Sequence, residues 1–256
     1  MSVVNNETSK AFPYSSFIPF YFNGLGISNN ATTPNTLLNV AAGSCLDSTG
    51  TFQLTLSSAV VINAATNGLN GLDTGTFAAS TVYKVFVVCD PVTQQAAGAM
   101  ISASATPLLP FGYSAYALIG YATTDASVHF LAGYWSDNDS ARRTFTYDAP
   151  IIALDNGAQT GYTGVALTAF VPPVANTPVV IYSDYTANAA ADIENLQGYN
   201  STGDAVTIIA PVAGATAHTT QQNTVLAQLN TAAPSIKYKV SAGTVDLYVC
   251  GYTFDL

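Results

Sequence analysis

Alternation of polar and apolar residues with a period of two is the feature that most constrains how this chain folds. It is strict over residues 51–57, where Phe52, Leu54 and Leu56 fall on one side. The segment Val82–Cys89 becomes a continuous apolar run after Lys84, which is typical of a strand covered on both faces. Comparable segments recur to the end of the chain, separated by turn residues. These patterns predict an all-β protein.

The strand-like segments fall into two series. The first series ends in a dense charge cluster just before residues 148–150, and a second series begins at Ile151. Each series has enough strands for a sandwich of its own. We therefore expect two antiparallel β-sandwich (jelly-roll-like) domains, at residues 37–148 and 149–256. An irregular N-terminal arm, residues 1–36, precedes them.

Some individual elements can be predicted as well. Residues 236–240 and 245–249 both alternate and flank a short link with Gly243, which predicts a terminal hairpin. Residues 116–121 and 127–134 form another candidate pair. Helix signals are few: residues 219–230 are the best candidate, and residues 192–196 could form one turn. The Thr and Asn content of the longer segment is unfavourable for a helix.

Charge is scarce. Charged residues make up 8% of the chain, and 6 Lys and Arg against 15 Asp and Glu give a net charge of −9. So few basic residues leave no electrostatic footprint for nucleic acid or for an anionic membrane surface. The polar surface must consist mainly of neutral hydroxyl and amide groups.

The cysteines and the N-terminus bear on the compartment. The three cysteines are odd in number and widely separated, which argues against a disulfide framework. Cys89 and Cys250 each end an apolar run, and we expect both to be buried thiols. Residues 1–10 lack a basic start followed by an apolar core, so no signal peptide is expected. Synthesis in the cytosol combined with a neutral, Ser/Thr/Asn-rich surface favours a virus or phage structural protein.

No group of residues indicates catalysis. His129 falls in a strand pattern and His218 in a loop, and neither has a recognisable nucleophile motif nearby. Residues 137–139 (Asp-Asn-Asp) open like a calcium loop, but Arg142 stands where that loop needs Gly. We expect a turn whose acids pair with Arg142 and Arg143, although a calcium site of another kind stays open. We therefore predict that the protein is not an enzyme and has no catalytic, cofactor-binding or metal-binding residues and no cofactor.

The first residues are unusually aromatic for an irregular segment. Such an arm could cap its own core or pack on a neighbouring subunit, and we favour the second possibility. The candidate subunit or capsid contacts are Phe12, Tyr14, Phe17, Phe20 and Tyr21.

A succession of short segments resembles a known class of proteins. Residues 43–50 (GSCLDSTG) precede the alternating strand, and residues 68–75 (GLNGLDTG) follow it. Residues 108–116 (LLPFGYSAY) and 119–121 (IGY) come next. This order, over about residues 40–148, resembles tailed-bacteriophage virion proteins of the head-decoration, head-fibre and tail-fibre kind. The resemblance implies a structural role on the virion surface after synthesis in the host cytoplasm, and it offers no catalytic residues.

These features lead to a first functional hypothesis and two alternatives. The first is a capsid decoration (cement) or head-fibre protein, a homo-oligomer and most simply a homotrimer, that contacts the major capsid protein or neighbouring virion proteins. Nucleic acid and membrane are not expected as partners. The main alternative is a tail-fibre or receptor-binding module that recognises a host surface glycan. A polysaccharide hydrolase that uses paired aspartates is a third, weaker possibility.

Overall fold

The computed structural model describes residues 22–90, 96–139, 142–202, 206–209, 218–231 and 233–255. Every regular element within these ranges is a β-strand. The predicted all-β class is therefore confirmed. No helix in the described part of the chain is long and apolar enough to cross a membrane.

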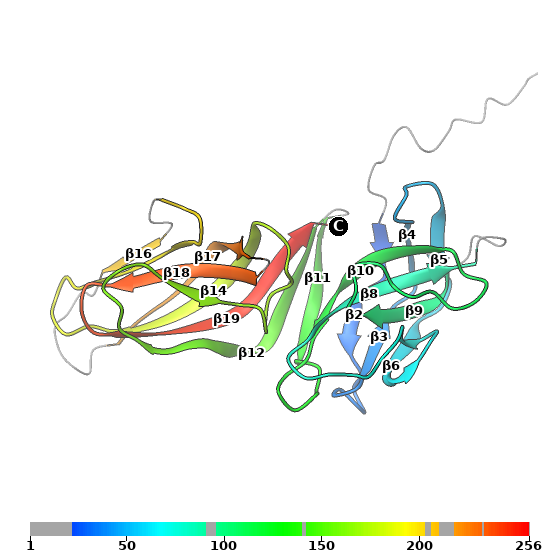
Figure 1. Ribbon diagram of the computed structural model, residues 1–256, viewed down its shortest axis with the longest axis horizontal. Helices are drawn as coiled ribbons and strands as arrows, with labels where there is room; N and C mark the ends of the chain where they lie inside the picture. Colours follow the sequence, from blue (N-terminus) through cyan, green and yellow to red (C-terminus); the bar gives the residue numbers. More distant parts are fainter. Residues whose placement is uncertain are drawn as a thin grey trace, which may run out of the picture.

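The strands form two units (Figure 1). The first unit, right of centre in Figure 1, comprises β1(Phe22–Gly24), β2(Ile27–Asn29), β3(Leu37–Val40), β4(Gly43–Leu46), β5(Gln53–Leu56), β6(Val60–Asn67), β7(Gly71–Leu72), β8(Val82–Cys89), β9(Ala96–Ser102) and β10(Ala115–Thr123). The second comprises β11(Gly133–Asp139), β12(Arg142–Gly157), β13(Thr163–Ala166), β14(Thr177–Thr186), β15(Ile193–Gly198), β16(Val206–Ile209), β17(His218–Asn230), β18(Ala233–Val240) and β19(Thr244–Asp255).

The first unit buries a core between a small and a large sheet. The small sheet has the order β1-β4-β5, and the large one runs β10-β8-β9-β7-β6-β3-β2. Leu54 of β5, Ile62 of β6 and Val85 of β8 are all fully buried in one cluster. The large sheet is mixed, because the short strand β7 runs parallel to both β6 and β9.

Strands β5 and β8 confirm the two patterns read from the sequence. In β5, Leu54 and Leu56 are buried while the residues beside them are exposed. In β8, Val85 and Val87 belong to the main core, whereas Phe86 and Val88 pack with Met100 in a second cluster on the other face. A strand that is covered on both faces has no solvent-exposed side, so its apolar residues follow one another without alternation.

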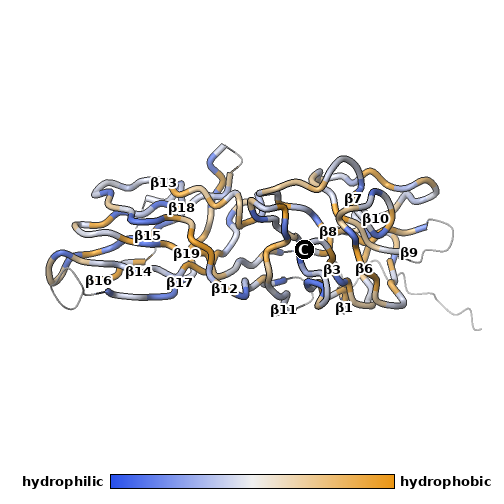
Figure 2. The backbone as a smooth tube through the Cα atoms, turned by 90° about the horizontal axis from the view of Figure 1, so that it is seen from below, coloured by the Kyte–Doolittle hydropathy of each residue, from blue (hydrophilic) through white to orange (hydrophobic). Residues whose placement is uncertain are grey.

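In the second unit the 16-stranded sheet folds back on itself into two facing layers, which we call the two sheets of this unit. Strands β12-β19-β14-β17 form one, and β13, β18, β15 and β16 form the other, and the two are joined where β17 pairs with β18. Figure 2 shows β13, β18 and β15 above β14, β17 and β12. Ile181 of β14, Leu247 of β19 and Ile236 of β18 are fully buried in the cluster between them.

The predicted terminal hairpin is wrong, although both of its strands exist. β18 pairs with β13, β15 and β17, whereas β19 pairs with β12 and β14. The link after Val240 therefore crosses from one sheet to the other. Gly243 makes this crossing possible: its φ is +84°, and a Cβ there would meet the Thr186 carbonyl oxygen at 2.0 Å.

Three other local predictions are also wrong. Residues 116–121 and 127–134 do not pair as strands, because β10 pairs with β8, and the isolated Thr124–Phe130 bridge begins beyond residue 121. The best helix candidate is β17, and the predicted turn at 192–196 lies mostly in β15. In β17, Val225 and Ala227 alternate with exposed residues, so a buried face overrides the ambiguous local pattern.

The units are joined by continuous hydrogen-bonded strands. β2 meets β11 at the Ser28–Tyr134 pair, and β11 pairs with β12. β12 runs through Asp148 without interruption, so the predicted domain boundary at 148/149 falls inside a strand and stays a prediction. Residues 22–36 of the expected arm include β1 and β2, and residues 1–21 lie outside the described residues.

Candidate functional site: the junction between the two units

The predicted contact residues cannot be placed. Phe12, Tyr14, Phe17, Phe20 and Tyr21 all precede Phe22, where the described chain begins. The strongest concentration of buried polar and aromatic contacts lies elsewhere, where β12 of the second unit meets β1 and β10 of the first.

Arg143 is the centre of this junction. It lies on β12 and is 1% exposed. Its Nη1 donates to the carbonyl oxygens of Ile119 (2.6 Å) and Leu25 (3.1 Å), and its Nη2 donates to that of Gly24 (2.7 Å). Its guanidinium carbon lies 4.0 Å from the centroid of the Phe22 ring. A planar, permanently charged group thus joins the second unit to three points of the first.

The backbone of the first unit is shaped to receive this side chain. Gly24 and Leu25 both adopt positive φ angles, +69° and +57°. A Cβ at Gly24 would lie 2.5 Å from the Ala42 carbonyl oxygen, so only glycine fits there. A positive φ at a leucine costs conformational energy, and such strain persists only where the surroundings fix it.

The neighbouring residue Arg142 has a different role from Arg143. Its Nε lies 2.9 Å from Asp255 Oδ1, and both side chains are more than half exposed. Successive residues of a strand point to opposite faces, so the side chains of Arg142 and Arg143 lie on opposite faces of β12. That signal could have identified Arg143 as the buried member. The side chains of residues 137–139, the expected acidic partners, lie outside the described residues.

An aromatic cluster, which we call the junction cluster, adjoins Arg143. Its members come from both units: Tyr121 of β10, Trp135 of β11, Phe145 and Tyr147 of β12, and Tyr252 and Phe254 of β19. The ring centroids of Tyr121 and Phe254 are 4.9 Å apart at 82°, an edge-to-face contact between the units. Trp135 packs against the cores of both units.

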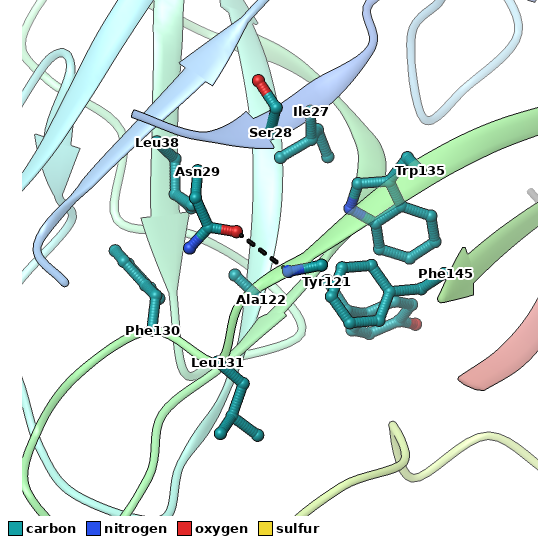
Figure 3. Close-up of a pocket in the computed structure, with 11 residues that line it drawn as sticks. Ile27, Ser28, Asn29, Leu38, Tyr121, Ala122, Phe130, Leu131, Trp135 and Phe145 are labelled. Carbon is teal, nitrogen blue, oxygen red and sulfur yellow. Dashed lines mark hydrogen bonds between the residues drawn. The ribbon is translucent and has the colours of Figure 1, made fainter. Parts of the chain in front are cut away.

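The cavity at this junction is too small for a ligand. Figure 3 shows its lining, in which Phe130 and Leu38 lie on one side and Trp135 and Phe145 on the other. Its volume is about 10 Å³, enough for one water molecule at most. The Gly133 amide donates to Asn29 Oδ1 at 3.3 Å and closes the lining between β11 and β2. The junction therefore joins the two units and does not enclose a ligand site.

The two histidines lie in the opposite kinds of segment from those predicted, a strand for His129 and a loop for His218. His129 lies in a turn, with Nδ1 3.7 Å from Asp125, and His218 begins β17. His218 Nδ1 lies 2.8 Å from Asp184 Oδ1 and 3.3 Å from Thr186 Oγ1. A catalytic relay needs the carboxylate and the hydroxyl on opposite ring nitrogens, so this contact is not a triad.

The cysteine thiols are held in their unreactive form. All three are free; Cys45 and Cys89 are buried and Cys250 is half-buried. Burial raises the pKa of Cys45 to about 12, although nearby Arg143 lowers it in part. The prediction of a buried thiol is confirmed for Cys89 and is wrong for Cys250, which is only half-buried. Within the ranges that the structure describes, no three His, Cys, Asp or Glu side chains lie close enough to hold a metal ion.

Comparison with known proteins identifies no family. No protein-family model and no curated protein matches this chain. A carbohydrate binding module (CBM6cm-2) from Cellvibrio mixtus lichenase 5A, in complex with cellotriose, is 16% identical over 48% of this chain and 85% of the module, with a TM-score of 0.23. The structure of infectious bursal disease virus, Gx strain, is 13% identical over 92% of this chain and 72% of that chain, with a TM-score of 0.18. At these scores, neither likeness assigns a fold family or a function to the protein.

Proposed function

We propose that this protein is a bacteriophage virion structural protein, a capsid decoration (cement) or head-fibre protein that acts as a homo-oligomer on the virion surface. Its fold would be two antiparallel β-sandwich, jelly-roll-like domains. It would be made in the host cytoplasm and would bind no nucleic acid or membrane. On this proposal the protein has no enzymatic activity.

The observation that carries this proposal is the buried Arg143 with its three carbonyl partners. Domains of one chain usually meet through modest polar interfaces that permit relative movement, unless the interface is large and hydrophobic. Here a charged side chain and six aromatic rings fix the junction instead. A rigid, two-unit body suits a protein that bridges or projects from a shell. The resemblance of residues 40–148 to phage virion proteins points the same way.

The aromatic N-terminal residues would supply the attachment. In the sequence, residues 1–21 directly precede β1, which belongs to the small sheet β1-β4-β5. A trimer would match the local three-fold axes of an icosahedral shell. Because the chain carries few charges, attachment would depend on apolar burial and neutral hydrogen bonds and little on salt.

Deletion of residues 2–21 tests the attachment. The deletion must stop before Phe22, because that ring stacks on Arg143. We expect a folded protein with an unchanged melting temperature that no longer binds purified particles. A matched variant keeps the segment but replaces Phe12, Tyr14, Phe17, Phe20 and Tyr21 by serine, and it should also fail to bind. Full occupancy of particles by either variant would contradict the proposed role of this segment.

The copy number per virion distinguishes a protein that decorates the capsid from one that belongs to the tail. Quantitative mass spectrometry of purified virions should find many copies if the protein decorates the capsid. A few copies would favour the alternative, a tail-fibre or receptor-binding module. Absence from purified particles would overturn the virion proposal altogether.

A further inference from the structure

A row of four side chains crosses the outer face of the sheet β12-β19-β14-β17. Ile152, Tyr248, Tyr182 and Gln222 stand directly opposite one another on the four adjacent strands. The ring centroids of Tyr182 and Tyr248 are 5.7 Å apart, with an interplanar angle of 60°. We call these two rings the tyrosine platform. Three steps between strands make the row about 14 Å long.

The two tyrosines do not belong to the core. Strand alternation turns Ile181 and Ser183 inward, where both are fully buried, and leaves Tyr182 between them on the outside. On β19, Leu247 and Val249 are likewise turned inward and fully buried, and Tyr248 between them lies on the outside. Both rings are half-buried, and Ile152 at the end of the row is 44% exposed. The two half-buried rings and the exposed Ile152 give this face an apolar strip that a bound molecule could cover.

A polar row runs beside the platform. Asp246 and Asp184 stand directly opposite each other, with Thr220 next in line. The Asn156 amide donates to Asp246 Oδ1 at 2.7 Å, and His218 Nδ1 lies 2.8 Å from Asp184 Oδ1. Like charges opposite each other in a sheet cost stability, and one hydrogen-bond partner for each carboxylate offsets part of that cost.

The carboxylates act directly on one of the rings. The pKa of Tyr248 is raised, first by partial desolvation and then by the negative charges of Asp246, Asp184 and Asp155. Acceptor oxygens thus lie beside the aromatic surface on the same face. Each ring has an apolar flat side and a polar hydroxyl, so the face offers stacking and hydrogen bonding together.

We propose that the tyrosine platform, with Asp184, Asp246 and Gln222, binds a neutral oligosaccharide. The C–H faces of two adjacent sugar rings would lie on Tyr182 and Tyr248. Hydroxyl groups at the edge of the sugars would donate to the carboxylates of Asp184 and Asp246, and the Gln222 amide could donate or accept. The length of the row suits a short chain of sugars rather than a single one. This site goes beyond the proposed virion role and is independent of it.

The charge of the face selects against acidic glycans. The described lysines and arginines lie elsewhere: Lys84 on β8, Arg142 and Arg143 at the start of β12, and Lys237 and Lys239 on the opposite sheet. Sialylated or uronic-acid glycans would meet the carboxylates of Asp184, Asp246 and Asp155 with no lysine or arginine beside them, and His218 is already held by Asp184. Neutral hexoses instead supply hydroxyl donors, which a carboxylate needs.

Glycan binding by the full chain tests this site. The probe is an array of neutral gluco-, manno- and galacto-oligosaccharides beside sialylated and uronic-acid oligosaccharides. The strongest neutral binder is then titrated by calorimetry. We expect binding to a neutral oligosaccharide that changes little between low and moderate salt, because the ligand carries no charge. Binding only to acidic glycans, or to none, would overturn the proposal.

Point variants locate the site. Tyr248→Ala and Tyr182→Ala should each weaken binding by about tenfold or more. Asp184→Asn and Asp246→Asn keep both rings and should weaken it by a smaller factor. The matched control is Tyr134→Ala, which removes a tyrosine of β11 that is 53% exposed and remote from the platform. Equal losses in the control and the platform variants would contradict the assignment.

A second copy of the chain is the competing occupant of this face. Sedimentation of the wild type and of Tyr248→Ala distinguishes the two cases. Self-association that Tyr248→Ala abolishes would assign the face to subunit contact and overturn glycan binding. An unchanged oligomeric state with lost glycan binding supports the proposal. Particle attachment should be the same for Tyr248→Ala as for the wild type. The experiments therefore distinguish failure of the glycan-binding proposal from failure of the virion proposal.

Discussion

The guanidinium group of Arg143 lies over the ring of Phe22, with 4.0 Å between the guanidinium carbon and the ring centroid. The two residues are far apart in sequence and belong to different units. Nη2 of the same arginine donates to the carbonyl of Gly24, which ends the strand that carries Phe22. β1 is therefore held at the junction by stacking and by a charge-assisted hydrogen bond.

Replacement of Arg143 should weaken the whole molecule. Arg143→Met removes the donors to two buried carbonyl oxygens, of Leu25 and Ile119, and to the partly buried one of Gly24, and we expect a loss of about 3 kcal/mol in unfolding free energy. Arg143→Lys retains the charge but not the planar fork, so its loss should be smaller. The control Arg142→Met removes an exposed ion pair and should cost less than about 1 kcal/mol. Urea unfolding measures all three, and equal effects of Arg142→Met and Arg143→Met would contradict the role of the junction.

The stability of the second unit should depend on pH through Glu194. This side chain of β15 is fully buried, and burial raises its pKa from 4.5 to about 7, although the Ser183 hydroxyl lowers it in part. Between these two values the folded state binds a proton that the unfolded state has released. Stability therefore falls as pH rises from about 4.5 to 7 and is level above that range.

Glu194→Gln should remove this dependence. The difference between the two pKa values corresponds to about 3 kcal/mol, so the variant should be more stable than the wild type at pH 8 by a value of that order. At pH 4 the two proteins should be nearly equal. Asp148→Asn, at an exposed position of β12, serves as the control and should leave the pH profile unchanged. A wild-type profile that is flat between pH 5 and 7 would exclude this account.

The crossing between β18 and β19 should not tolerate a side chain at Gly243. Gly243→Ala would place a Cβ against the Thr186 carbonyl and would force alanine to a φ of +84°, so we expect a loss of about 2 kcal/mol. Gly161→Ala is the matched control, because nothing lies within 4 Å of its added Cβ. Thermal unfolding compares the two. A Gly243→Ala variant as stable as Gly161→Ala would mean that the link does not cross between the sheets in this way.

The thiol of Cys45 should resist alkylation in the native protein. Its pKa of about 12 leaves almost no thiolate at pH 8, and the side chain is 3% exposed. Iodoacetamide labelling followed by mass spectrometry should modify Cys45 only after unfolding in urea. Labelling of Cys45 at the same rate with and without urea would show that the core of the first unit opens readily.

The sequence predicts strands much better than it predicts their partners. The alternation in β5 and the apolar run of β8 identify both strands, because each pattern reports how many faces are covered. A short link with Gly243 looks the same whether it closes a hairpin or crosses between sheets. Pairing depends on which apolar faces meet across the core, and that information is not local.

The junction was missed for a related reason. Charge near residues 137–143 indicates a solvated turn. The strand alternation could have assigned Arg143 to the buried face, but it does not show that the partners there are backbone carbonyls of the other unit. The tyrosine platform was not predicted either, because Tyr182 and Tyr248 become neighbours only when β14 pairs with β19. Aromatic residues on strands are usually assigned to the core, and their outward position follows from the register alone.

The central claim is that the two units form one rigid body, and a distance measurement between them tests it most directly. Spin labels at Thr55 on β5 and Thr224 on β17, both exposed, report on the separation of the units in a Cys250→Ser background. Labels at Asp155 and Thr224 within the second unit give the reference width. Double electron–electron resonance should find a single inter-unit distance distribution as narrow as the reference. A broad or two-peaked distribution in the wild-type protein would contradict the claim.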